Sequence, residues 1–349
     1  MPCYHPKIRI ENKHKLVTAA DGHKYHPAVI EEPDDIYFRI EQIKNHPWYD
    51  YQIIPCRNCI GCRLEYSREW ANRGYLESLK SEHNYFVTLT YSDDNLKFYD
   101  ELTTSDGITY ADYDNSWNGT LVPEELTNFI KRFRKELTKK GIAEWKYMAC
   151  GEYGGKTQRP HYHMILFNCP LPIESFYNPK IINKEVYFQN KIIEKEWTLG
   201  ISNITEASWE TIAYVARYIT KKVNGKTSED HYCSQGQEKE FFRVSKGLGR
   251  DYYERNKHKI YDTDEIIIKN RKGGHSIKPP KYFDDLYKKE NPTAFDVIKK
   301  KRQKLQKDSE AVKDTTFSTG RLENLLIREK SHEEKNTRLI RSLDKPSDY

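Results

Sequence analysis

The short apolar runs between residues 85 and 167 constrain the fold of this chain more than any other feature. Three of them, "YFVTLTY" (85–91), "WKYMAC" (145–150) and "HYHMILF" (161–167), are rich in the aromatic and β-branched residues that favour strands. Only a short glycine-containing segment separates the last two runs, which is typical of neighbouring antiparallel strands. Between the first two runs, apolar residues recur at helical spacing: Leu126, Phe129, Ile130, Phe133 and Leu137. We therefore predict an α+β fold, with a central antiparallel β-sheet packed against helices.

The order of these patterns along the chain suggests three parts. The 349 residues are enough for one large domain or two smaller ones. Residues 1–63 are expected to form an irregular N-terminal region of short extended pieces and turns that ends in a cysteine cluster. Residues 64–257 are predicted to be the main domain, in which the acidic, turn-rich residues 100–120 form an inserted loop. Residues 258–349 are strongly charged, and we expect a helical or disordered C-terminal extension that contacts a phosphate backbone or a partner, or is merely a solvated tail.

Charge and cysteine usage narrow the functional class. The 58 lysine and arginine residues exceed the 52 aspartate and glutamate residues by six, which alone is weak support for a polyanionic partner. The 26 tyrosines, interleaved with basic residues, suit stacking on unpaired bases or simply reflect a tyrosine-rich composition. Seven clustered cysteines argue against a secreted disulfide framework. No apolar run approaches the roughly 20 residues of a membrane span, so we expect a soluble, intracellular protein without membrane contact.

Two histidines lie one residue apart in "QRPHYHMILFN" (158–168). Because side chains alternate along a strand, His161 and His163 share one face, while Tyr162 and Met164 lie on the other. The pair could be hydrogen-bonded polar residues of the sheet, or ligands of a divalent ion that serves phosphate chemistry. Glu152 could join them on the same face if the segment between forms a turn, or it could be a surface carboxylate of that turn.

The segment "SWETIAYVARYITKKVNG" (208–225) is predicted to be a helix, with Ser208 as N-cap and Gly225 as terminator. An apolar stripe runs along it through Ile212, Val215, Ala216 and Ile219. Tyr214, Tyr218 and Lys221 fall roughly on the opposite side, and we expect the phenols to be turned away from the stripe. A tyrosine pair on a helix is more often packing than catalytic. Two phenols beside a lysine on a polar face, however, are suited to attack a phosphodiester.

Three cysteines in "CRNCIGC" (56–62) have the spacing of a zinc site. Cys56, Cys59 and Cys62 are one ligand short of a closed structural site, which Cys3 or His5 could complete. A structural zinc ion is the favoured interpretation; ordinary reduced cysteines or cysteines that contact DNA are the alternatives. The other cysteines are predicted to be ordinary buried thiols: Cys150, Cys169 and Cys233.

Together these segments resemble the HUH endonuclease superfamily. "RPHYHMILF" resembles its metal-binding motif, "YVARYITKK" resembles the two-tyrosine motif of its rolling-circle replication initiators, and "FVTLTY" resembles the strand motif that precedes both. With "PCRNCIGCR" and "RVSKGLGRDYY" as flanks, the chain is most similar to the initiators of microviruses, the small icosahedral single-stranded DNA phages, in particular gokushovirus-like ones. The resemblance covers roughly residues 50 to 255.

The resemblance implies an origin-specific nickase built on a ferredoxin-like, RRM-like sheet. It implies Mg²⁺ or Mn²⁺ bound by His161 and His163, with Glu152 as the third ligand. Tyr214 and Tyr218 would be nucleophiles and Lys221 would assist by neutralising charge. One tyrosine would cut the origin strand, keep its 5′ phosphate and leave a 3′ hydroxyl for synthesis; after one round the other would cut again, and the displaced strand would be closed into a circle.

These implications extend to partners and location. We expect the protein to bind single-stranded origin DNA in the cytoplasm of a bacterial host, and to act with a host helicase and polymerase. Basic residues are expected to contact the DNA: Arg159, Arg217, Lys222, Lys131 and Arg134. Two alternatives stay open, namely an HUH transposase or relaxase, and a non-catalytic module that binds single-stranded nucleic acid by stacking.

Overall fold

The computed structural model describes residues 3–22, 24–114, 116–155, 157–182, 185–221, 228–270, 273–316 and 321–337. The chain divides into two compact units. Unit 1 comprises residues 1–65 and 299–339, and unit 2 comprises residues 66–298 and 340–349. The boundaries expected after residues 63 and 257 stay predictions. None of the helices among the described residues is long and apolar enough to cross a membrane.

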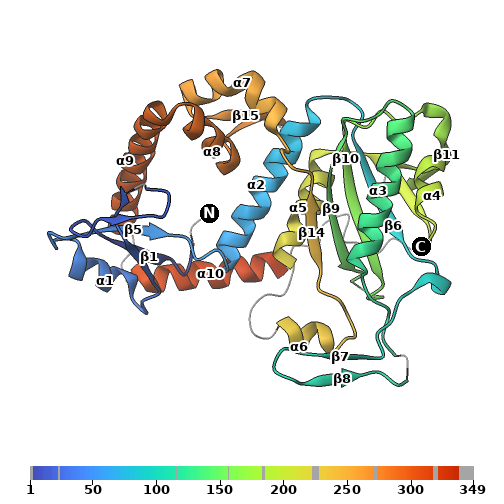
Figure 1. Ribbon diagram of the computed structural model, residues 1–349, viewed down its shortest axis with the longest axis horizontal. Coiled ribbons are helices and arrows are strands. Elements are labelled where there is room, and N and C mark those ends of the chain that lie inside the picture. The colour runs from blue at the N-terminus through green and yellow to red at the C-terminus, as the bar shows by residue number, and fades with distance from the viewer. Residues whose placement is uncertain are drawn as a thin grey trace. The chain divides into compact units, whose positions relative to one another are not determined.

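A large antiparallel sheet forms the centre of unit 2. Among the described residues, seven strands pair in the order β11-β12-β13-β6-β10-β9-β14. Figure 1 labels β6, β9, β10, β11 and β14 of this sheet. Their bounds are β6 (Tyr85–Thr90), β9 (Lys146–Tyr153), β10 (Pro160–Phe167), β11 (Phe176–Ile182), β12 (Glu185–Asn190), β13 (Ser202–Glu206) and β14 (Phe241–Val244). The three runs that predicted strands are β6, β10 and β9, which are neighbours in the sheet and pair antiparallel. The predicted α+β class is therefore confirmed.

Helices cover both faces of this sheet. The helices between residues 60 and 290 are α2 (Ile60–Ser78), α3 (Pro123–Lys139), α4 (Lys191–Glu196), α5 (Trp209–Lys221), α6 (Ser228–Cys233), α7 (Arg250–Thr263) and α8 (Lys281–Glu290). Of these, α2, α3, α4 and α5 pack on the sheet. On one face, α3 and α4 pack against side chains such as Tyr162 and Met164. On the other, α5 and part of α2 pack against Ile165 and Phe167. The elements β6-α3-β9-β10-α4-β13 follow the βαββαβ order of a ferredoxin-like core.

Local signals account for α3. Pro123 occupies its first turn, where the missing N–H costs nothing, and the acidic Glu124 and Glu125 complement the helix dipole there. The helix buries the five residues predicted from their spacing, from Leu126 to Leu137. The predicted inserted loop, residues 100–120, contains a two-stranded hairpin of β7 (Glu101–Thr103) and β8 (Thr109–Ala111).

The buried carboxylate of Glu77 ties α2 both to β9, through an ion pair, and to the segment "SKGLGR" (245–250), through a hydrogen bond. Glu77 is 2% exposed, and its carboxylate accepts hydrogen bonds from the Lys146 ammonium at 2.9 Å and from the Gly249 backbone N–H at 2.6 Å. Gly249 has a φ of 83°, in the left-handed region that a residue with a Cβ rarely adopts. One turn earlier, Arg73 donates to the carbonyl of Leu248 at 3.0 Å. This part of the "RVSKGLGRDYY" motif therefore anchors a helix to the sheet.

Tyrosines form a buried hydrogen-bonded group on the α3 side of the sheet. The Tyr91 and Tyr162 hydroxyls lie 2.6 Å apart, Tyr91 also donates to Glu125, and Tyr162 accepts from the Val122 N–H at 2.9 Å. Burial raises the pKa of Tyr162 to about 12 and raises the pKa of Tyr91 well above its ordinary value. Tyr162 is thus a packing residue, as its place between the two histidines predicted.

We expect this group to make the protein sensitive to alkali. A phenol whose pKa is raised in the folded state holds its proton more tightly there, so its stabilising effect is full below the unfolded pKa of about 10 and is lost as the pH rises above it. Urea unfolding monitored between about pH 9 and pH 11.5 should therefore show a steadily falling free energy of unfolding. The fall should be shallower in Tyr162→Phe but unchanged in Tyr113→Phe, whose phenol is 85% exposed. Equal slopes in all three proteins would contradict this account.

A second, smaller core of unit 2 lies around a hairpin and the helices α7 and α8. The hairpin β15 (Ile266–Asn270) and β16 (Gly273–Ile277) pairs antiparallel. Its residues pack with α2, α7 and α8 through Leu76, Tyr253, Ile260, Ile266 and Phe283. The charged region that starts near residue 258 thus contains packed helices and a hairpin.

Unit 1 contains a three-stranded antiparallel sheet in the order β4-β1-β5, with bounds β1 (Lys7–Asn12), β4 (Ala28–Glu31) and β5 (Tyr49–Ile54). A smaller pair joins β2 (Val17–Thr18) to β3 (Lys24–Tyr25). The helix α1 (Ile36–Ile43) buries Ile36, Ile40 and Ile43 against Ile8 and Ile10. Short extended pieces were expected here, whereas α1 was not. At the C-terminal end, α9 (Pro292–Thr316) and α10 (Arg321–Thr337) follow, so the helical alternative holds for these residues.

Candidate active site

Strands β9 and β10 bring together the three residues proposed from the sequence as metal ligands. The register of the pair places Glu152 opposite His161, and Cys150 opposite His163. The Nε2 atoms of His161 and His163 lie 2.8 and 2.9 Å from the same carboxylate oxygen, Oε1 of Glu152. One ligand atom from each residue can be chosen so that all lie within 4.8 Å of one another. The two histidines therefore share a face, as predicted. The antiparallel pairing of β9 with β10 places Glu152 on the same face.

Other groups orient the two imidazoles through their second nitrogens. Nδ1 of His161 lies 3.1 Å from the carbonyl oxygen of Arg159, and Nδ1 of His163 lies 3.0 Å from the hydroxyl of Thr88 on β6. A proton on Nδ1 of His161 that is donated to this carbonyl would leave the Nε2 lone pair for a metal ion, whereas the hydrogen bond from Nε2 to Glu152 needs a proton on Nε2. Such outer contacts are typical of metal-binding histidines, because they fix the ring and its tautomer.

The charge balance of this group favours a cation. Glu152 is 3% exposed. Burial alone would raise the pKa of its carboxyl, but the hydrogen bonds with His161 and His163 outweigh burial and hold the pKa well below its usual range. The site is therefore a buried carboxylate flanked by two imidazole nitrogens that converge on it. One carboxylate oxygen and two imidazole nitrogens are a donor set that suits a divalent ion with positions left for substrate.

The two tyrosines of α5 are buried at this site rather than turned to the polar side. Tyr214 is 5% exposed and Tyr218 is 2% exposed. The Tyr214 hydroxyl donates to Oε1 of Glu152 at 3.2 Å, and the centroids of the Tyr214 and Tyr218 rings lie 5.3 and 6.2 Å from that of His163. The expectation that the phenols lie away from the packed face was wrong. The aliphatic stripe is only part of the buried face of α5, because the phenols pack on the histidines of the sheet.

Burial also determines the protonation of the Tyr218 phenol. Burial, reinforced by the negative charge of Glu152, raises the pKa of Tyr218 well above its ordinary value. This phenol is therefore held in its neutral, protonated form. To act as a nucleophile it needs additional positive charge nearby, which a bound divalent ion or a lysine can supply. Lys221 is the last residue of α5, and Lys222 and Gly225 lie outside the described residues. At the other end of the helix, Ser208 accepts from the Thr211 N–H at 3.3 Å, as expected of an N-cap.

Comparison with known proteins shows which family the chain belongs to. Residues 84–223 match the model of the family "Replication-associated protein ORF2/G2P". The chain is 39% identical to the replication-associated protein ORF2 of Spiroplasma virus 4 over 73% of this chain and 74% of the relative. It belongs to the replication-associated protein family. It is also 32% identical to the replication-associated protein VP4 of Bdellovibrio phage phiMH2K, over 68% of this chain and 69% of the relative.

A third relative is the replication-associated protein ORF4 of Chlamydia phage 1, which is 29% identical over 68% of this chain and 54% of that protein. No solved structure matches the chain. The family match covers β6, β9 and β10, the histidine pair and the tyrosine helix described above. The resemblance to the rolling-circle replication initiators of microviruses is thus confirmed, and replication of phage DNA in a host cell is the setting in which the family places this chain.

Two of the five basic residues expected to contact DNA lie beside the site of this family member. Arg217 is 7% exposed, with its guanidinium 5.2 Å from the centre of the Tyr214 ring. Arg159 precedes the histidine strand, pairs with Asp93 and donates to the Tyr91 carbonyl at 3.0 Å. These contacts give both arginines structural partners, and contact with DNA stays a prediction for each.

Two others lie on the opposite face of the sheet. Lys131 is exposed on α3, and Arg134 lies over the Trp145 ring at 4.2 Å. Because α3 packs on the face opposite the histidines, the structure does not bring these two residues to the site. Their side of α3 was basic in sequence, but the pattern could not tell which face of the sheet the helix covers.

Three further residues at the site were not predicted. Thr88 and Phe86 lie on the histidine face of β6, and the Phe86 ring stacks on His163 with centroids 5.1 Å apart. Cys150 is fully buried beside them on β9, as predicted for an ordinary thiol. The alternation of "FVTLT" puts Phe86 and Thr88 on one face, so the signal was present. To place Phe86 and Thr88 beside the histidines from this signal, however, one would also have needed the register between β6 and β10.

The cysteines of the N-terminal cluster also come together. One sulfur atom from each of Cys3, Cys56, Cys59 and Cys62 lies within 4.8 Å of the others. His5, the alternative fourth ligand, instead contacts Glu329, with 2.6 Å between its Nε2 and a carboxylate oxygen. Outside this cluster Cys169 is buried as predicted, whereas Cys233 is partly exposed.

Proposed function

We propose that this protein nicks the origin strand of phage DNA with a tyrosine nucleophile, retains the 5′ phosphate as a phosphotyrosine, and later rejoins the displaced strand. The observation that carries the proposal is the contact between the Tyr214 hydroxyl and Glu152, at 3.2 Å, on the same carboxylate oxygen that His161 and His163 approach. A nucleophile and a donor set for a divalent ion thus meet at one point.

Glu152, His161 and His163 would hold Mg²⁺ or Mn²⁺. When bound, the ion would supply positive charge to the scissile phosphate and favour the phenolate over the phenol. Thr88 and the Arg159 carbonyl keep the two imidazoles directed at the site. Arg217 beside Tyr214, together with Lys221, would add positive charge against the phosphate.

The attack of Tyr214 on the scissile phosphate needs no further reactant. The Tyr214 oxygen forms a bond to phosphorus as the bond between phosphorus and the 3′ oxygen breaks. The phenol loses its proton, and the departing 3′ oxygen gains one to become a hydroxyl. One phosphodiester replaces another, so the same residues can run the step in reverse and rejoin a strand.

Two phenols in one site suit two successive cuts. The rings of Tyr214 and Tyr218 lie 5.1 Å apart on the same helix, and both lie near His163. While one tyrosine carries the DNA, the other is placed to attack the origin that replication has regenerated. The freed 3′ hydroxyl then attacks the first phosphotyrosine and closes a circle. We propose that this occurs in the cytoplasm of the bacterial host, where a helicase and a polymerase of the host extend the first 3′ hydroxyl.

A covalent adduct tests the proposal. The full chain is incubated with labelled single-stranded DNA that carries the phage origin, in the presence of Mn²⁺, and resolved on a denaturing gel. We expect an adduct from the wild type, none with EDTA, and none from Tyr214→Phe with Tyr218→Phe together. Tyr113→Phe is the control, because its phenol is 85% exposed. An undiminished adduct from the double variant would sink the proposal, and binding without any adduct would favour a non-catalytic module.

A further inference from the structure

The four clustered cysteines of unit 1 lie at the spacing of a single metal ion. The sulfur atoms of Cys56 and Cys62 are 3.9 Å apart, and those of Cys3 and Cys59 are also 3.9 Å apart. Zinc binds thiolates at about 2.3 Å in a tetrahedron, which places sulfur atoms about 3.8 Å from one another. All four are free thiols, so no disulfide accounts for the spacing. An iron–sulfur cluster would hold its cysteines farther apart, because iron and sulfide ions lie between them.

Backbone N–H groups point at these sulfur atoms. The N–H of Cys56 donates to Cys3 at 3.2 Å, that of Cys59 to Cys56 at 3.3 Å, and that of Tyr4 to Cys59 at 3.4 Å. Arg57 adopts a φ of 69°, a conformation that non-glycine residues seldom take, in the turn between two of the cysteines. Hydrogen bonds of this kind stabilise negatively charged sulfur, and four cysteine sulfurs this close together would need a cation between them if they lost their protons.

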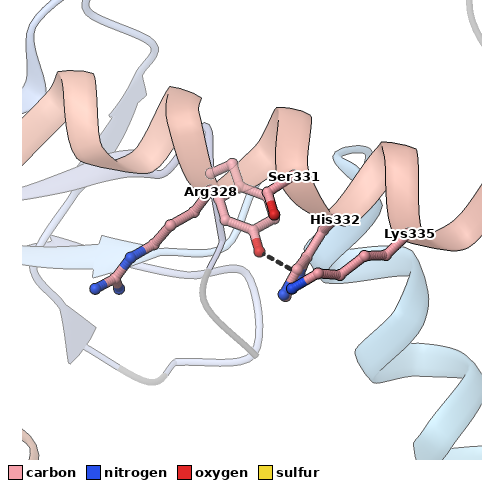
Figure 2. Close-up of a pocket in the computed structure, with 5 residues that line it drawn as sticks. Arg328, Ser331, His332 and Lys335 are labelled. Atoms are coloured by element: carbon pink, nitrogen blue, oxygen red, sulfur yellow. Dashed lines mark hydrogen bonds between the residues drawn. The ribbon is translucent and has the colours of Figure 1, made fainter.

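The residues that follow Cys3 hold the helix α10. Tyr4 is fully buried, and its hydroxyl lies 2.6 Å from Nδ1 of His332, the contact dashed in Figure 2. His5 lies 2.6 Å from a carboxylate oxygen of Glu329, and Leu325 packs against the cysteines. Leu325, Glu329 and His332 are spaced by four and three residues, which places them on one face of α10.

We infer that the four cysteines bind one zinc ion, and that this ion fixes the N-terminal segment as the surface on which α10 docks. The inference is independent of the nickase chemistry, because no residue of the cluster belongs to that site. Its consequence is that the two ends of the chain fold together only when the metal is present. Zinc here has a structural role, since four thiolates leave no open position for substrate.

Measurement of the metal content tests whether the four cysteines bind zinc. The full chain, purified without added chelator, should contain one zinc ion by native mass spectrometry and elemental analysis. Cys59→Ser and Cys62→Ser should lose the zinc, whereas Cys233→Ser, a matched change outside the cluster, should keep it. Cobalt should substitute with the absorption of a tetrahedral thiolate site. Absence of metal from the wild type, iron in its place, or a disulfide by mass would overturn the inference.

Hydrogen exchange tests whether the zinc ion holds α10 in place. It does not depend on whether the cysteine variants fold. Withdrawal of zinc by a zinc-selective chelator should speed amide exchange in α10 at least about 10-fold and leave β9 and β10 unchanged. His332→Ala should keep the zinc yet speed exchange in α10. If zinc is bound but α10 exchanges equally fast with and without it, docking through the metal is wrong.

Discussion

Replacing Glu152 with glutamine is expected to lower the proposed Mn²⁺-dependent DNA cleavage by at least about 100-fold at a low, fixed metal concentration, because loss of even an outer contact costs about 10–100-fold in metal sites. Glutamine has nearly the same shape and can still accept hydrogen bonds from His161 and Tyr214. It lacks the negative charge that makes Glu152 the anionic member of the donor set. The loss should therefore fall on metal binding rather than on the fold.

The metal dependence of cleavage provides the measurement. Adduct formation is followed over a Mn²⁺ titration, and the variant should need much more Mn²⁺ and recover part of its activity at the highest concentrations. Glu206→Gln, an exposed glutamate at the end of β13 in the same sheet, is the control and should behave as the wild type. A Glu152→Gln protein that cleaves normally at low Mn²⁺ would exclude this carboxylate as a ligand. Thermal unfolding of both variants shows whether the fold survives.

Replacing Lys146 with methionine is expected to reduce the free energy of unfolding by about 3 kcal/mol, the lower end of the range for breaking a buried ion pair. The Glu77 side chain is 1% exposed, and the Lys146 ammonium 2.9 Å away is its cationic partner. Without Lys146, a buried carboxylate keeps only the Gly249 N–H. The lower end of the range applies because the Lys146 side chain is itself 21% exposed, so water can partly compensate.

Urea unfolding of three variants tests whether the unpaired carboxylate of Glu77 causes this loss of stability. Lys146→Met together with Glu77→Gln should be less destabilised than Lys146→Met alone, because the neutral amide tolerates burial better than an unpaired carboxylate. Lys195→Met removes the partner of Glu136 at 3.3 Å, where the lysine side chain is 63% exposed, and should destabilise the protein much less than Lys146→Met, because water screens an exposed ion pair. Equal losses in the two single variants would mean that burial of the pair does not matter.

The features that local rules determine were predictable from sequence. The bounds of α3 follow from Pro123 at its start and from the spacing of its apolar residues, both within one helix. The shared face of His161 and His163 follows from the two-residue period of a strand. Glu152 could be placed beside them because the intervening turn is short enough for a hairpin.

The sequence did not predict which side chains of a helix are buried, or on which face of the sheet a helix packs. The helical wheel of α5 identified its aliphatic stripe, but a phenol that faces a histidine–carboxylate group is buried as well, as Tyr214 and Tyr218 show. Likewise, a basic side of α3 could not reveal that Lys131 lies on the face of the sheet away from the histidines. Such outcomes depend on long-range packing, which a single-sequence pattern does not contain.

The choice between Cys3 and His5 illustrates the same limit over a longer distance. More than fifty positions separate them from Cys56 to Cys62, and both neighbours of Tyr4 have suitable ligand atoms. The decision rests on α10, whose Glu329 contacts His5 and whose His332 contacts Tyr4. The sequence near the N-terminus contains no pattern that indicates contact with that helix.

The spacing of the two phenols has a mechanical consequence. Four residues of an α-helix amount to about 400° of rotation and about 6 Å of rise, so Tyr214 and Tyr218 differ by only about 40° in direction and by about one turn along α5. The three residues proposed as metal ligands, in contrast, all come from one hairpin, β9 and β10. In the proposed mechanism, alternation between the two tyrosines would therefore move the attacking oxygen along α5 while the proposed ligands stay in place.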